Sequence, residues 1–112
     1  MKYFTKDEFR MGNLIVFDKM QHDLLIKLDE LRECVNEPLH INSSYRSKDW
    51  NKSVGGSKKS QHLTGNAVDL HCGNSTLRGQ IVKYALELGL SCGIAKNFVH
   101  VDNRRNQIVF TY

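Results

Sequence analysis

The 112-residue sequence contains no long hydrophobic run, since nowhere do about 18 apolar residues follow one another. A membrane-spanning helix is therefore not expected. The first residues, MKYFTKDEFRM, also lack the apolar core of a secretory signal peptide. We accordingly expect synthesis in the cytoplasm without a leader that directs export.

Cysteine is scarce, and its pattern argues against two kinds of site. The chain has three cysteines, Cys34, Cys72 and Cys92, with no Cys-x-x-Cys pair. An odd number without paired spacing is not typical of a disulfide framework or of a thiolate zinc site. We expect small buried apolar side chains instead. Cys72 follows His71 directly, but neighbours on a strand point to opposite faces, so a Cys-His dyad is not expected.

Acidic residues are fewer than basic ones. Twelve Asp and Glu oppose 16 Lys and Arg, which gives a net charge of +4 and a pI near 9.1. The basic residues are scattered apart from one cluster in a loop region, formed by Lys48, Lys52, Lys58 and Lys59. No fold signature of a nucleic-acid-binding protein accompanies the cluster, so we expect no nucleic-acid partner. The cluster is most simply a solvated loop, and its second use would be electrostatic attraction of an anionic polymer.

Apolar periodicity and capping residues predict an α+β fold. Thr5 and Glu8 form a capping box for the first helix, and Asp18 serves as the N-cap of the second. The expected helices cover residues 6 to about 12, 18–36, 47–50 and 74 or 75 to 89. The expected strands cover residues 39–43, 67–71, 98–102 and 108–112. We therefore predict one domain, residues 1–112, in which helices pack on a small, mainly antiparallel sheet that carries the site.

A histidine and an aspartate lie seven residues apart in SQHLTGNAVDL, Ser60 to Leu70. The Gly-Asn pair between them tolerates positive φ, so the chain can reverse and bring His62 back over Asp69. Asp69 lies in a strand whose alternation places it on the opposite face from the apolar residues Val68 and Leu70.

A second histidine lies near the C-terminus in the segment FVHVD. Alternation along this strand places His100 and Asp102 on one face and the two valines on the other. Two histidine nitrogens and one carboxylate oxygen make a typical open zinc site, with the fourth position left for water. We expect His62, Asp69 and His100 to form such a site.

The pattern Ser-x-His-x-x-Gly-x-Ala-x-Asp, from Ser60 to Asp69, resembles the zinc signature of the D-alanyl-D-alanine carboxypeptidase family. That family includes bacterial D-Ala-D-Ala dipeptidases and phage endolysins, and its fold is related to the hedgehog signalling domain. The resemblance extends upstream to INSSYRSKDWNKSVGG, similar to the family's substrate-arginine segment, and downstream to FVHVD. It covers nearly the whole chain.

The resemblance implies a function and a role for each residue that matches. One zinc ion would be held by His62, Asp69 and His100, Arg46 would bind substrate or stabilise the oxyanion, and Ser60 would contact substrate. The implied reaction is zinc-dependent hydrolysis of peptide bonds in the stems of bacterial peptidoglycan, by a carboxypeptidase or an endopeptidase. We expect a monomer that acts at the bacterial cell wall after release, most economically as a phage lysis enzyme, although a host enzyme stays open.

One position departs from the family's pattern. Several branches have an acidic general base three residues before the last zinc histidine, where this chain has Asn97. An amide cannot accept the proton of a water molecule. We prefer Asp102 as the base, with His71 as a further candidate, while Asp102 could instead orient His100. Two alternative functions stay open: a non-catalytic zinc-containing cell-wall-binding domain of the same fold, and a basic module that binds nucleic acid or cell wall.

Overall fold

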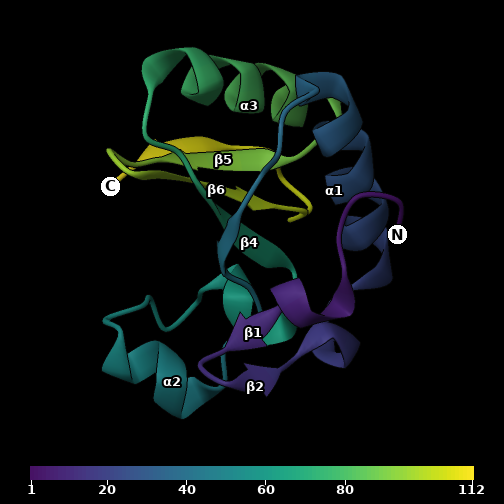
Figure 1. Ribbon diagram of the computed structural model, residues 1–112. Coiled ribbons are helices and arrows are strands. Elements are labelled where there is room, and N and C mark those ends of the chain that lie inside the picture. Colours follow the sequence, from purple (N-terminus) through teal and green to yellow (C-terminus); the bar gives the residue numbers. More distant parts are fainter.

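The computed structural model describes residues 1–112, and its centre is a five-stranded sheet with the order β3-β4-β6-β5-β7. Two long helices, α1 (His22–Val35) and α3 (Ser75–Glu87), pack against this sheet, while α2 and the β1–β2 hairpin lie at the opposite end of the molecule from α3 (Figure 1). No helix has both the length and the apolar character that a membrane span requires. The predicted α+β class is confirmed.

The remaining elements are short. The 3-10 turns are η1 (Lys6–Glu8), η2 (Phe17–Lys19) and η3 (Gln61–Thr64), and the short helix is α2 (Lys48–Ser53). The strands are β1 (Arg10–Met11), β2 (Leu14–Ile15), β3 (Ile41–Ser43), β4 (Ala67–His71), β5 (Ser91–Ile94), β6 (Phe98–Asp102) and β7 (Val109–Thr111).

The sheet is mainly antiparallel, as predicted, with one parallel pair at its edge. β4 pairs with β3 and β6, and β6 pairs with β5, all antiparallel, whereas β7 pairs with β5 in parallel. In the β4–β6 register, Asp69 lies directly opposite His100 and Ala67 lies opposite Asp102. Residues paired in this way present their side chains on the same face of the sheet.

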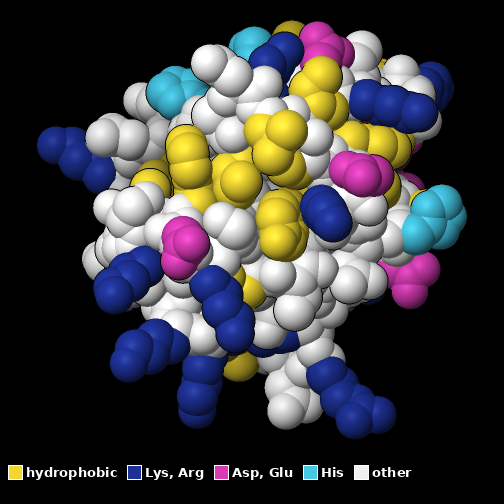
Figure 2. Space-filling model, turned by 90° about the horizontal axis from the view of Figure 1, so that it is seen from below, with side chains coloured by type: hydrophobic (Ala, Val, Ile, Leu, Met, Phe, Trp, Pro, Cys, Tyr) yellow, Lys and Arg dark blue, Asp and Glu magenta, His cyan; other side chains and the backbone are white.

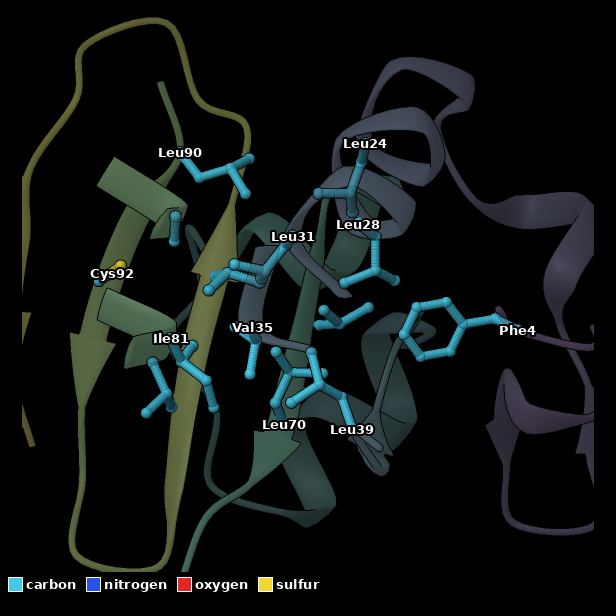
Figure 3. Close-up of a cluster of buried hydrophobic side chains, with 14 of the residues drawn as sticks. Phe4, Leu24, Leu28, Leu31, Val35, Leu39, Leu70, Ile81, Leu90 and Cys92 are labelled. Atoms are coloured by element: carbon cyan, nitrogen blue, oxygen red, sulfur yellow. The ribbon is translucent and has the colours of Figure 1, made fainter. Parts of the chain in front are cut away.

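The hydrophobic core lies between the sheet and the two long helices. Leu24, Leu28 and Leu31 recur at helical spacing on α1 and are fully buried, and they face Leu70 of β4 and Ile81 of α3 (Figure 3). Burying one such leucine contributes about 2 kcal/mol. The opposite face of β4 and β6 is thus left for the polar side chains.

Several predicted element boundaries are wrong, for reasons of tertiary contact. The capping box of Thr5 and Glu8 is present, but the helix ends at Glu8 because the chain then enters the β1–β2 hairpin. α1 begins after Gln21 and not after Asp18. The backbone N–H of Gln21 donates to the carbonyl of Gly65 at 2.9 Å, and this contact separates η2 from α1.

The other differences concern the strands and one cysteine. β5 was not expected from the sequence. β7, which follows β6 along the chain, lies beside β5 in the sheet. The first predicted strand begins at Ile41 and not at 39, and the helix that Ser47 caps continues to Ser53. Cys72 and Cys92 are buried as predicted, whereas Cys34 is exposed.

Gly65 fixes the turn between η3 and β4. Its φ of +70° lies in the left-handed region, and an added Cβ would lie 2.0 Å from the carbonyl oxygen of Lys19. Both the conformation and the close approach therefore require glycine at this position. The turn in this form holds η3 against the end of β4.

We expect Gly65→Ala to lower the free energy of unfolding by more than about 1 kcal/mol, because alanine is strained at positive φ and clashes with backbone. Gly79→Ala is the matched control, since Gly79 lies within α3 and nothing surrounds its Cβ position within 4 Å. It should raise stability by about 0.5–1 kcal/mol. Urea unfolding of both variants checks this, and equal stability of Gly65→Ala and the wild type would contradict it.

Candidate metal centre

Three buried side chains meet on the polar face of the sheet. The donor atoms of His62, Asp69 and His100 all lie within 4.8 Å of one another. Oδ1 of Asp69 lies 3.2 Å from Nε2 of His62 and 3.0 Å from Nδ1 of His100. The structure therefore brings together the three residues that the sequence predicted as metal ligands.

Each of the three residues is placed by a different element. Asp69 lies at the middle of β4, and His100 lies opposite it on β6. His62 belongs to η3, whose N-cap Ser60 accepts a hydrogen bond from the backbone N–H of His62 at 3.2 Å. The turn at Gly65 then returns the chain so that the imidazole of His62 lies over the strand.

Outer hydrogen bonds orient both imidazoles. Nδ1 of His62 lies 2.7 Å from the carbonyl oxygen of Ser44, which can only accept, so the proton resides on Nδ1. Nε2 of His100 lies 2.7 Å from Oδ2 of Asp102. Each ring thus uses one nitrogen to bind the protein and turns the other toward Asp69. Such contacts fix the tautomer and direction of a metal-binding histidine.

Asp102 is fully buried behind His100 and is held by Arg104. Its Oδ1 accepts from the backbone N–H and Nε of Arg104 at 3.1 and 2.9 Å, and its Oδ2 accepts from Nη2 at 2.6 Å. Burial opposes ionisation, but the hydrogen bonds from Arg104 and His100 outweigh it and lower the pKa of Asp102 to about 2. Of the two predicted roles, the contacts of Asp102 favour orienting His100 over acting as the base.

The electrostatics of the cluster favour a positive charge. Burial opposes the ionisation of Asp69, yet its hydrogen bonds to His100 and His62 hold its pKa well below the usual range. Burial likewise opposes protonation of His100, but Asp102 and Asp69 outweigh it and raise the pKa of the ring. Two imidazole nitrogens and an ionised carboxylate oxygen form a donor set that fits a divalent metal ion such as zinc.

A cavity of about 570 Å³ opens over the cluster. Its lining includes Arg46 and Ser60, the two residues to which the family resemblance assigned contact with substrate. Asp69 is the only acidic residue in the lining. Asn97 and His71 are both exposed and lie outside this cavity, so His71 is not placed to act as a base there.

Arg46 is fixed by three hydrogen bonds at the edge of the cluster. Nη2 donates to Oδ2 of Asp69 at 3.1 Å, Nε donates to Oγ of Ser43 at 2.9 Å, and Nη1 donates to Oδ1 of Asn51 at 3.2 Å. A guanidinium carries five N–H donors. Two donors, one on each terminal nitrogen, therefore remain for a substrate.

The sequence did not identify the aromatic wall of the cavity. Phe110 packs against His100 with ring centroids 5.4 Å apart, and Tyr112, just after β7, packs against Phe110 with centroids 5.6 Å apart. A Cβ on Gly93 would lie 2.5 Å from the Phe110 ring, so this glycine leaves the space that the ring occupies. The sequence predicted the last strand, but it did not predict that this strand, β7, would pair with β5.

The comparisons with known proteins define the class. The sequence profile of the Peptidase M15 family matches residues 2–102, and the chain belongs to this family. The resemblance found in the sequence is confirmed at this level.

Two named relatives show what the chain is similar to. The peptidoglycan L,D-endopeptidase MepK of Escherichia coli K12 is 33% identical over 110 residues, which cover 91% of this chain and 59% of MepK. The protein of the same name in Shigella flexneri matches equally. The chain thus spans less than two thirds of the length of these relatives.

A solved structure supports the fold. The L-Ala D-Glu endopeptidase ChiX of Serratia marcescens superimposes with a TM-score of 0.56 over 76% of this chain and 80% of ChiX, at 19% sequence identity. The arrangement of helices on a mainly antiparallel sheet is therefore shared with ChiX.

Proposed function

We propose that this domain hydrolyses peptide bonds in bacterial peptidoglycan, using a zinc ion held by His62, Asp69 and His100. The observation that carries the proposal is the convergence of the three donor atoms, within 4.8 Å of one another, at a cavity large enough for a peptide segment. Membership of the Peptidase M15 family supports peptide hydrolysis, and the name of MepK supports the substrate. The name of MepK also favours an endopeptidase over a carboxypeptidase.

When bound, zinc supplies Lewis acidity, which activates water and polarises a carbonyl group. The chain's own residues prepare the cavity for this chemistry. Asp102 accepts a hydrogen bond from Nε2–H of His100 and so keeps Nδ1 free on the cavity side. Arg46 offers its two remaining N–H donors to a substrate carboxylate or to the oxyanion that develops during hydrolysis. Ser60, at the rim, can contact the peptide.

We place this activity at the bacterial cell wall, because the substrate lies there. The setting of a phage lysis enzyme rests on the family that the sequence resembles, which includes phage endolysins. A second candidate function is binding of the wall by the same zinc-containing domain without hydrolysis. The observation in its favour is that Asp69 is the only carboxylate lining the cavity. Hydrolysis of peptidoglycan by the purified protein would distinguish the first function from the second.

The purified protein should contain about one zinc ion per chain, and His62→Ala and His100→Ala should each reduce the content to near zero, because two ligands cannot hold the ion. His71→Ala is the matched control, since this exposed histidine lies outside the cavity. Plasma emission analysis measures the content. Full zinc in both ligand variants would show that the metal is held elsewhere.

Asp102→Asn should weaken zinc binding by about 10- to 100-fold, the scale usual for residues that orient a metal ligand. The amide keeps the shape of the side chain but loses the negative charge that holds the His100 proton. Competition with a chelator of known affinity measures the effect. Unchanged zinc affinity together with abolished hydrolysis would identify Asp102 as the general base instead.

Arg46→Lys should lower the rate of peptidoglycan hydrolysis by at least about tenfold, or about 1.4 kcal/mol, because an ammonium group cannot reproduce the fork of donors. Zinc content should not change. Arg105→Lys is the control, because this exposed arginine lies near the site in sequence but does not line the cavity. Equal rates for the two variants would leave Arg46 without a role in hydrolysis.

A further inference from the structure

A second cavity, of about 570 Å³, lies beside α2 and carries three lysines. Its lining consists of Lys48, Asn51, Lys52, Gly55, Gly56, Lys58 and Leu63. No acidic side chain is among these residues. We refer to it as the lysine cavity.

Local structure explains why the three lysines face one space. Lys48 and Lys52 lie four residues apart on α2, so they share one side of the helix. Lys58 lies on the loop that follows, and this loop is tied to the helix by Asn51. The side chain of Asn51 donates to the carbonyl of Ser57 at 2.9 Å, and its backbone carbonyl accepts from Gly56 at 2.8 Å.

None of the three lysines has an ion-pair partner within the chain. Like charges gathered at one cavity repel one another, and their field attracts anions. Figure 2, which views the end of the molecule that carries α2 and the β1–β2 hairpin, shows Lys and Arg side chains standing out along one edge of this face. The lysine cavity is therefore suited to a negatively charged ligand.

The lysine cavity and the cavity over the candidate metal centre share one wall. Gly55 and Gly56 line both cavities. The side chain of Asn51 lines the lysine cavity and also accepts the hydrogen bond from Nη1 of Arg46, which lines the other. A Cβ at Gly56 would lie 1.9 Å from Oδ1 of Asn51 and 3.1 Å from Nη1 of Arg46. Only glycine therefore leaves room for the hydrogen bond between these two side chains.

Positively charged side chains predominate in the lining of both cavities. Arg46, Lys59 and Arg104 line the first cavity, and three lysines line the second. The only carboxylate facing either cavity is Asp69, which already binds Arg46 and both histidines. An acidic chain could thus lie across the glycine pair without meeting an unpaired negative charge.

We propose that the lysine cavity is a second subsite for an acidic peptide substrate, which binds a carboxylate of the peptide while the bond to be cut lies over His62, Asp69 and His100. The proposal rests on the proposed function, because it assigns both cavities to one ligand. We assign the anionic group to a carboxylate of the peptide and not to a phosphate of a wall polymer, because a ligand in the lysine cavity that crosses the shared wall at Gly55 and Gly56 reaches the candidate metal centre, where the peptide bond is cut.

The test uses the double variant Lys48→Ala/Lys52→Ala of the zinc-loaded protein and two synthetic stem peptides, one with free side-chain carboxylates and one with these amidated. For the acidic peptide, KM should rise about five- to tenfold while kcat stays the same, on the scale of two exposed charge pairs. For the amidated peptide, KM should not change. The control Lys83→Ala/Lys96→Ala removes two exposed lysines outside both cavities.

An equal KM for the double variant and the control, or an equal rise on both peptides, would overturn the subsite. If the wild type cuts neither peptide, the proposed function fails, and calorimetric binding of the acidic peptide to the same variants decides the subsite separately. Weaker binding by the double variant alone then supports it, and equal binding overturns it. Binding of inorganic phosphate is measured for the same variants. If the wild type binds phosphate with a Kd below about 1 mM, and the double variant loses this binding while its peptide binding is unchanged, the cavity binds phosphate and the peptide assignment is overturned.

Discussion

The antiparallel pairing of β4 with β6 is the constraint on which the site depends. It places Asp69 directly opposite His100 and, because side chains alternate, it turns Val68, Leu70, Val99 and Val101 into the core. A slip of one residue would bury the polar face against the leucines of α1 and expose the valines. The burial of apolar side chains therefore fixes the same register that brings two of the three candidate metal ligands together.

The candidate metal centre is further defined by groups that hold the outer nitrogens of its two histidines. Ser44 and Asp102 each bind the outer nitrogen of one histidine, and Arg104 holds Asp102 by three hydrogen bonds. The two histidine contacts are buried and Asp102 has no exposed surface, so a lost hydrogen bond would leave a buried polar group unsatisfied. The direction of the imidazoles is thus part of the stability of the fold and is present before any ligand arrives.

The sequence predicted the parts of the site that depend on local pattern. Ligand types, the turn at Gly65 and alternation along two strands sufficed to bring His62, Asp69 and His100 together. It did not predict β5 or the parallel placement of β7, because strand order is set by long-range packing. Phe110 and Arg104 were therefore missed. The contact between Gln21 and Gly65 likewise moved the start of α1 in a way that no capping pattern at Asp18 could reveal.

The central claim is that this buried cluster cuts peptide bonds of the cell wall when it holds zinc. Mass analysis of the fragments released from purified peptidoglycan tests it most directly, with zinc-loaded protein compared with protein stripped by a chelator. The account predicts fragments separated by hydrolysis of a peptide bond with the zinc-loaded protein, and none with the stripped protein until zinc is restored. Unchanged peptidoglycan after incubation with fully zinc-loaded protein would contradict it.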